Sequence, residues 1–110
     1  MAEIKIQKLK RIIEKHFESS KLKLDKIVLF GSYAEGKQKA DSDVDILLIS
    51  RNFRDKNYDN RFIPILDLNK ELVKNLDKPV DLLYYSDEEW ENDQSLIIRE
   101  AKQHGKVIYG

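Results

Sequence analysis

Apolar residues follow one another along this chain with the period of a helix in some segments and of a strand in others. In the first segment Ile6, Leu9, Ile13 and Phe17 recur every three or four residues, which predicts a helix over Glu3–Ser19. Short apolar runs bounded by polar turn residues predict three buried strands, over Leu24–Phe30, Val44–Ile49 and Val80–Tyr84.

Two more helical patterns lie between and after these strands. The spacing of apolar residues predicts a long helix before Pro79, with Pro64 in its first turn. The apolar face of this helix is expected to consist of Phe62, Ile65, Leu66, Leu72, Val73 and Leu76. Ser86 and Glu89 form a capping box, so a further helix should begin at Asp87 and be closed by Gly105. The apolar side of that helix is Trp90, Ile97, Ile98 and Ala101.

The alternation of helices and strands predicts the fold class α/β (α+β), in which helices cover a small mixed sheet of about three to four strands. Lys106–Tyr109 is expected to add a short final strand, and the polar segment Arg51–Asn60 a surface loop. With 110 residues and neither a linker nor a repeat, residues 1–110 are expected to form a single domain.

Composition narrows the classes of protein. Lysine plus arginine and aspartate plus glutamate number 20 each, and this balance argues against strong nucleic-acid binding by the chain itself. Cysteine is absent, and the two histidines, His16 and His104, offer little for a histidine metal site. No apolar run approaches the roughly 20 residues that cross a bilayer. We therefore expect a cytoplasmic protein without a membrane partner.

Candidate chemistry begins where the first predicted strand ends. Gly31 lacks a Cβ atom, so the chain can turn sharply there and a ligand can approach the backbone closely. Ser32 adds a hydroxyl and a backbone N–H, and a short helix starting here would present N–H groups to an anion such as phosphate. Taken alone, Gly-Ser after a strand is also typical of an ordinary turn.

Asp43 and Asp45 stand two residues apart where the second predicted strand begins. The strand period places both carboxylates on one face, roughly 7 Å apart at Cα, while Val44 and Ile46 point into the core. Adjacent carboxylates raise each other's pKa unless a cation lies between them. Mg²⁺ binds one or two carboxylates together with substrate phosphates, and two metal ions can share such a pair. A solvated strand start is the alternative.

Asp81 interrupts the apolar run of the third predicted strand. An unpaired buried carboxylate costs free energy, so Asp81 should lie at an exposed strand end or beside a cation. Gly31 ends its strand, whereas Asp43, Asp45 and Asp81 begin theirs. They converge at one edge only if the first strand runs antiparallel to the other two, which would then be parallel and joined by the long helix.

Gly31-Ser32, ten intervening residues and Asp43-x-Asp45 form a pattern that resembles the signature of the polymerase-β-like nucleotidyltransferase superfamily. The fuller pattern, with Ala34, Gly36 and Ser42, resembles the minimal nucleotidyltransferases, or MNT proteins, of bacteria and archaea. Asp81 matches the third carboxylate of that family. Because element order, spacing and length agree, the resemblance covers essentially the whole chain.

The resemblance implies a role for each motif residue. The catalytic, metal-binding residues would be Asp43, Asp45 and Asp81, and the nucleotide-binding residues would be Gly31, Ser32 and Ser42. The implied cofactor is Mg²⁺, as two ions, with ATP as donor. The implied reaction is attack of a hydroxyl on the α-phosphorus, with release of pyrophosphate.

The resemblance also implies a partner. MNT proteins commonly act as antitoxins to a helical HEPN protein, an RNA-cleaving toxin, and some modify a tyrosine hydroxyl of it. We therefore expect transfer of AMP to a hydroxyl of a HEPN-type partner, with a homo-oligomer also open. Three strands and three helices leave little surface for an acceptor pocket, so another chain should supply the acceptor. The alternatives are a non-catalytic module that neutralises its partner by binding, and transfer to a small molecule such as an aminoglycoside.

One position departs from the family pattern: Glu35 stands where arginine is common. A cation for the triphosphate is missing there unless Lys37 or Lys39 replaces it, so weak triphosphate affinity is expected. Other conspicuous residues have structural interpretations. Tyr84, Tyr85 and Trp90 are expected to pack in the core, and a solvated basic loop is expected to hold Arg51, Arg54, Lys56 and Arg61.

Overall fold

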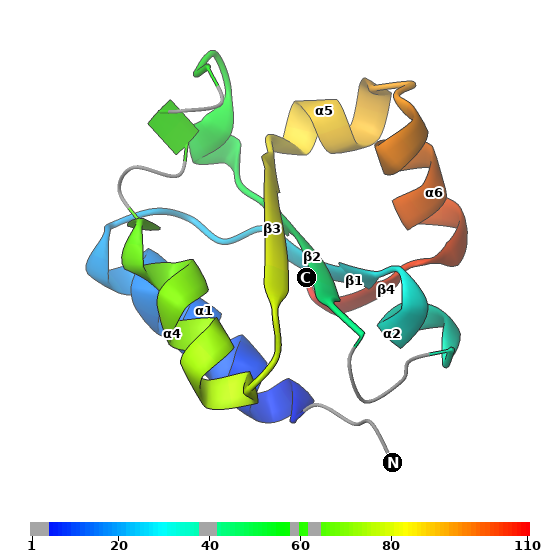
Figure 1. Ribbon diagram of the computed structural model, residues 1–110. Coiled ribbons are helices and arrows are strands. Elements are labelled where there is room, and N and C mark those ends of the chain that lie inside the picture. The colour runs from blue at the N-terminus through cyan, green and yellow to red at the C-terminus, as the bar shows by residue number, and fades with distance from the viewer. Residues whose placement is uncertain (1–4, 38–41, 58–59, 62–64) are drawn as a thin grey trace.

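Four strands form one mixed sheet in the order β3-β2-β1-β4 (Figure 1). The computed structural model describes residues 5–37, 42–57, 60–61 and 65–110. Strand β1 (Lys26–Phe30) lies between β2 (Val44–Ile49) and β4 (Lys106–Tyr109) and is antiparallel to both. Strand β3 (Val80–Tyr85) is parallel to β2. The expected mixed sheet, with its first strand antiparallel to the next two, is therefore confirmed.

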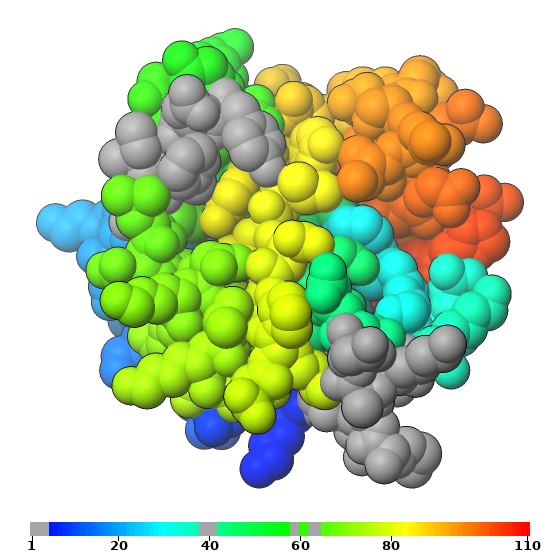
Figure 2. All heavy atoms as spheres, viewed as in Figure 1, coloured from blue at the N-terminus to red at the C-terminus, as the bar shows by residue number. Residues whose placement is uncertain are grey.

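Helices cover both faces of this sheet. In Figure 1, α1 (Ile6–Ser19) and α4 (Asp67–Leu76) lie on one side of β3, and α5 (Asp87–Asn92) and α6 (Leu96–His104) on the other. Figure 2 shows β3, in yellow, at the surface between the two layers.

The residues of β2 divide between two cores because successive side chains of a strand point to opposite faces. Ile46 and Leu48 join the larger core beneath α1 and α4, whereas Leu47 and Ile49 join the smaller core beneath α5 and α6.

The first helical layer follows the apolar period with one correction. Near α4 the buried residues are Ile65, Leu68 and Leu72, spaced by three and four. Leu66 and Val73 are exposed, because each stands about 100° round the helix from a buried neighbour. The expected single apolar face was therefore wrong at these two positions.

Three of the expected features fall partly or wholly outside the described residues, namely Phe62, Pro64 and the helix start at Glu3. His16 of α1, for which the sequence offered no partner, lies 2.9 Å from Glu71 of α4 between Nε2 and Oε1 and links the two helices. Within the described ranges, no helix is long and apolar enough to span a bilayer.

The single helix expected from Asp87 is in fact two helices. The predicted capping box between Ser86 and Glu89 is present. The first helix stops at Asn92, and Asp93 then accepts a hydrogen bond on Oδ1 from the backbone N–H of Ser95 at 2.9 Å. Such side-chain bonds to nearby backbone offer the chain an alternative to the helix, which accounts for the break.

Gly105 follows α6 directly, as expected for a residue that closes the helix. Its φ is −83°, so the left-handed conformation does not explain the glycine. A Cβ atom at this position would lie 2.4 Å from the carbonyl oxygen of Ala101. Glycine is required here because the chain passes too close to the end of α6 for any side chain.

Three arginines tie the segment after β2 to the rest of the fold. Arg51, Arg54 and Lys56 are exposed, as expected for a solvated loop, whereas Arg61 is buried, so the expectation was wrong for Arg61. Arg51 Nη2 donates to Asp25 Oδ1 at 2.8 Å, and Arg54 pairs with the carboxylate of Asp87. Phe53, at the end of the 3₁₀ helix η1 (Arg51–Phe53), is buried edge-on against the ring of Tyr84. The acidic partners lie far away in sequence, which hid these pairs.

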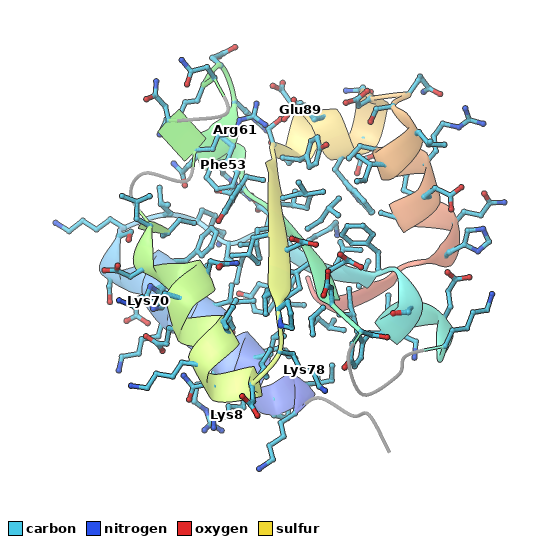
Figure 3. All side chains as sticks on the ribbon, viewed as in Figure 1. Lys8, Phe53, Arg61, Lys70, Lys78 and Glu89 are labelled. Atoms are coloured by element: carbon cyan, nitrogen blue, oxygen red, sulfur yellow. The ribbon has the colours of Figure 1, made fainter. Side chains whose placement is uncertain are left out.

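Arg61 is the buried member of this group, with 8% of its surface exposed. Its Nη1 donates to Glu89 Oε1 at 2.6 Å and to the carbonyl oxygen of Tyr84 at 3.0 Å, and its Nε donates to the carbonyl oxygen of Lys56 at 3.1 Å. Figure 3 shows Arg61 and Glu89 pointing toward each other beside Phe53. Arg61 therefore joins the segment after β2 to the beginning of α5.

Replacing Arg61 by alanine should lower the free energy of unfolding by about 2 kcal/mol, because Glu89, the buried carbonyl group of Tyr84 and the partly buried carbonyl group of Lys56 lose a charged donor. Urea denaturation of the purified chain measures this change. Arg54→Ala is the matched control, since its pair is exposed, and it should have a much smaller effect. Equal losses in the two variants would contradict a structural role particular to Arg61.

Candidate active site

Two of the predicted carboxylates meet at the sheet edge where β2 and β3 begin. In the parallel register Asp45 lies directly opposite Asp81. On its other side Asp45 lies opposite Phe30, the last residue of β1, which Gly31 follows. The sheet therefore brings the Gly-Ser turn and these carboxylates together, as the sequence predicted.

The site lies on the face covered by α5 and α6. Leu47 of β2 and Leu83 and Tyr85 of β3 belong to the smaller core on that face. The period of two therefore places the side chains of Asp45 and Asp81 on the same face, at the strand starts. Asp81 is exposed and Asp45 is half-buried, which leaves the pair open to solvent on one side.

Burial raises the pKa of Asp45 to about 6, aided by the charge of Asp81, by a hydrogen bond between the two carboxyl groups, and by the charge of Asp43. Removing a carboxylate from water and placing others beside it both disfavour its ionised form. A cation bound between these groups would relieve this cost. The electrostatics of the pair therefore favour a positively charged ligand.

Gly31 leaves the space into which Asp45 projects. Its φ of +73° and ψ of −153° are strongly unfavourable for residues with a side chain. A Cβ atom on Gly31 would lie 2.3 Å from Oδ2 of Asp45. Ser32 then opens the short helix α2 (Ser32–Glu35), whose first N–H groups have no acceptor within the helix. Ser42, which is half-buried, directly precedes Asp43.

The carboxylates suit a divalent cation without forming a complete cage for one. In the part of the chain that the structure describes, no three His, Cys, Asp or Glu side chains are placed to hold one metal ion together. Mg²⁺ commonly takes one or two protein carboxylates and fills its remaining positions with water and substrate phosphates. The Asp45–Asp81 pair, with Asp43 beside it, fits this kind of incomplete site.

A pocket of about 390 Å³ adjoins the Gly-Ser turn. Its walls include Phe30, Gly31, Glu35 and, from α6, Leu96, Ile97 and Glu100. Sequence reasoning missed it because α6 lies more than 60 residues beyond Gly31 and carries no recognisable motif. The exposed Glu35, which replaces the family's common arginine, faces this pocket and lies 3.7 Å from Lys37 Nζ through Oε1. Lys39 lies outside the described residues.

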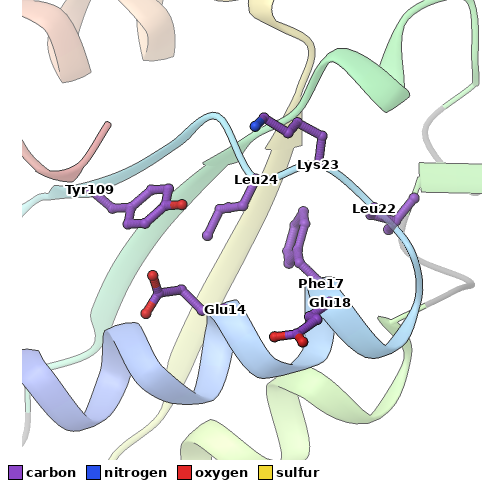
Figure 4. A pocket seen from close by; sticks show the side chains of 7 residues that line it. All are labelled: Glu14, Phe17, Glu18, Leu22, Lys23, Leu24 and Tyr109. Carbon is purple, nitrogen blue, oxygen red and sulfur yellow. The ribbon is translucent and has the colours of Figure 1, made fainter.

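A second pocket, of about 290 Å³, lies in the opposite layer, between α1 and the strand ends (Figure 4). Glu14 and Glu18 of α1, Lys23 and Tyr109 are among its lining residues. Phe17 and Leu24, which also line it, belong to the larger core, on the other side of the sheet from Asp45. This pocket therefore does not adjoin the carboxylates.

Comparison with known proteins gives matches over nearly the whole chain. Residues 7–110 match the family model described as polymerase beta, nucleotidyltransferase. A protein of Methanocaldococcus jannaschii that is named as a protein adenylyltransferase is 39% identical over 80 residues, which are 71% of this chain and 76% of that protein.

Two solved structures are similar in fold. A crystal structure of a toxin–antitoxin with AMP-PNP has a TM-score of 0.64 and 28% identity, over 91% of this chain and 72% of that chain. A structure of a tri-AMPylated HEPN toxin in complex with an MNT antitoxin from Shewanella oneidensis has a TM-score of 0.59 and 24% identity, over 96% of this chain and 73% of that chain. At 24% identity, the similarity to the Shewanella complex shows only that the two proteins share a fold.

Asp45→Asn should stabilise the protein at pH 7.5 by about 1 kcal/mol, a value reduced for solvent screening because the carboxylate is only half-buried. The pKa of Asp45 is raised from 3.8 to about 6, so its ionisation costs the folded state nothing below pH 3.8 and its full amount above pH 6. The advantage of the variant should therefore disappear as the pH falls from 6 to 4. Denaturant unfolding across this range tests it, and a pH-independent difference would contradict it.

Gly31→Ala should displace the Asp45 carboxylate and return its pKa toward the ordinary value, because the new methyl group would lie 2.3 Å from Oδ2 and clash with it. Carboxyl-carbon NMR titration measures this pKa. Gly36→Ala is the matched control: Gly36 also has a positive φ, of +71°, but a Cβ there meets no atom within 4 Å. It should cost about 1 kcal/mol of backbone strain and leave the Asp45 titration near pH 6. An unchanged titration in Gly31→Ala would rule out this contact.

Proposed function

Because the chain belongs to the polymerase β nucleotidyltransferase family, we propose that it transfers AMP from ATP to a hydroxyl group of a HEPN-type protein, as the antitoxin of a toxin–antitoxin pair. The family makes the chain a nucleotidyltransferase. We assign this reaction to the carboxylate site because the register of β2 with β3 sets Asp45 opposite Asp81, beside Gly31.

The donor, acceptor and partner in this proposal are supported by the relatives. The name of the M. jannaschii protein, protein adenylyltransferase, supports AMP as the transferred group and a protein as acceptor. The toxin–antitoxin structure with AMP-PNP, at 28% identity, supports an adenine nucleotide and a toxin as partner. The name HEPN comes from the Shewanella complex and from the resemblance in the sequence.

In the proposed reaction Asp43, Asp45 and Asp81 hold divalent cations, and Gly31 and Ser32 accommodate the β- and γ-phosphates with Ser42 assisting. Cations bound there would neutralise the triphosphate and the leaving pyrophosphate. The residues of the chain would position the reacting groups: Gly31 lets the phosphates approach the backbone, and the sheet holds the carboxylates in place.

The chemical step transfers one adenylyl group, the AMP part of ATP, to the acceptor. The acceptor oxygen forms a bond to the α-phosphorus, the bond from that phosphorus to the bridging oxygen breaks, and pyrophosphate leaves. The proton of the hydroxyl passes to a carboxylate, for which Asp81 is well placed because it is the exposed member of the opposed pair. Asp45, whose pKa is raised by burial and by its acidic neighbours, binds a proton more readily when no cation is present.

A second function is favoured by Glu35, which places a negative charge next to Gly31 where the family commonly has arginine. In this alternative the chain neutralises its toxin by binding alone. The two functions differ in whether the carboxylates are needed, so one experiment distinguishes them.

Incubation of the chain with α-³²P-labelled ATP, Mg²⁺ and a HEPN-type protein of the same genome should label that protein. Asp43→Asn, Asp45→Asn and Asp81→Asn should each reduce labelling at least 100-fold, because each removes a proposed cation ligand. Asp67→Asn, an exposed aspartate of α4 in the opposite layer, is the matched control and should retain full labelling.

Chelation of Mg²⁺ by EDTA should abolish labelling as well. Binding of the partner without labelling in any condition would instead support the non-catalytic module. Labelling of an added aminoglycoside, with the partner unlabelled, would support transfer to a small molecule.

A further inference from the structure

The pocket beside Gly31 combines an opening to solvent with an apolar wall. Leu96, in the first turn of α6, is 72% exposed, more than the other large hydrophobic residues that are exposed in the described ranges. Next to it, Ile97 is partly buried and packs against the core around Trp90. Exposed apolar surface that forms one wall of a concave site is typical of an interaction surface.

The pocket lies on the same side of the sheet as the carboxylates. Phe30, which lines the pocket, lies opposite Asp45 in the register of β1 with β2. Gly31 also lines the pocket, and the Asp45 carboxylate projects toward it, so that a Cβ atom on Gly31 would lie 2.3 Å from Oδ2. In Figure 2 the cyan atoms near the end of β1 are visible between green β2 and the orange and red atoms of α6. A group that enters the pocket therefore comes close to the reacting phosphate of the proposed reaction.

Acidic groups surround the pocket. Glu35 and Glu100 line it, and Asp45 lies beyond Gly31. Two basic side chains lie near these carboxylates among the described residues: Lys37 Nζ is 3.7 Å from Glu35 Oε1, and His104, which also lines the pocket, has Nε2 3.9 Å from Glu100 Oε2. This charge repels a phosphate backbone, so it disfavours a nucleic acid as the occupant, and it favours a protein segment that carries lysine or arginine.

From the apolar wall, the acidic rim and the contact with Asp45, we infer that this pocket docks the acceptor protein. The docked segment inserts an apolar side chain against Leu96 and Ile97 and places basic residues beside Glu35 and Glu100. This inference rests on the proposed function, because it takes the acceptor to be a protein. It gives the nucleotidyltransferase domain itself a surface that positions the acceptor beside the carboxylates.

Two substitutions test the two features of the surface. Leu96→Ser removes the exposed apolar group, and Glu100→Lys reverses a rim charge; both side chains are exposed, so the fold should be unaffected. Each should weaken binding of the HEPN-type protein at least tenfold, measured by isothermal titration calorimetry without ATP. The matched controls are Leu66→Ser, at a leucine that is 60% exposed near α4, and Glu18→Lys, at the other pocket (Figure 4). Both controls should bind normally.

A parallel titration with AMP-PNP and Mg²⁺ separates docking from nucleotide binding. Leu96→Ser and Glu100→Lys should leave this affinity within twofold of the unsubstituted chain. If they weaken AMP-PNP binding and spare partner binding, the pocket holds the nucleotide and the docking inference is overturned. Partner binding that is equal in the docking and control variants would also overturn it.

The same set of measurements keeps this inference separate from the proposed function. If the two variants lose the partner but no label is ever transferred, docking stands and the transfer activity fails. If label is transferred equally well by the two variants and the controls, the transfer stands and docking fails. If the partner does not bind the unsubstituted chain at all, both fail.

Discussion

The contact between Asp45, which is half-buried, and Asp81 is the interaction around which the site is built. The parallel register of β2 and β3 sets these two residues opposite each other, so the fold enforces a contact that water would not favour. The apolar residues of β2 and β3 that are buried on both faces of the sheet hold the two strands in this register. Gly31 then leaves the room that the Asp45 carboxylate occupies. A positively charged ligand bound between the two carboxylates would offset this cost.

Much of this arrangement was predictable from local sequence. The strands are short apolar runs, and period two predicts that Asp43 and Asp45 share a face. That Asp81 shares the face of Asp45 depends on the register of β2 with β3, which the structure supplies. The antiparallel first strand followed from requiring Gly31 and these carboxylates to meet at one edge. The capping box at Ser86 was predictable because it involves residues only three apart.

Other features depend on contacts that a linear pattern does not contain. The pairs Arg61–Glu89 and His16–Glu71 join residues 28 and 55 positions apart, and only the packed helices bring them together. The break before α6 depends on one side-chain hydrogen bond that competes with the helix. The pocket at Leu96 is a surface shared by three elements, so no single segment predicts it. The roles assigned to the motif residues remain predictions.

Strand β1 has a further consequence for the biosynthesis of the protein. Its two neighbours are β2, which follows after a short interval, and β4, which ends at Tyr109, near the end of the chain printed here. Closing the pair of β1 with β4 spans about 80 residues, and such long-range pairing slows folding because loop closure must come first. On the ribosome, β1 waits for its second partner until residue 109 has emerged from the exit tunnel. The complete four-stranded sheet therefore forms only after β4 has been synthesised.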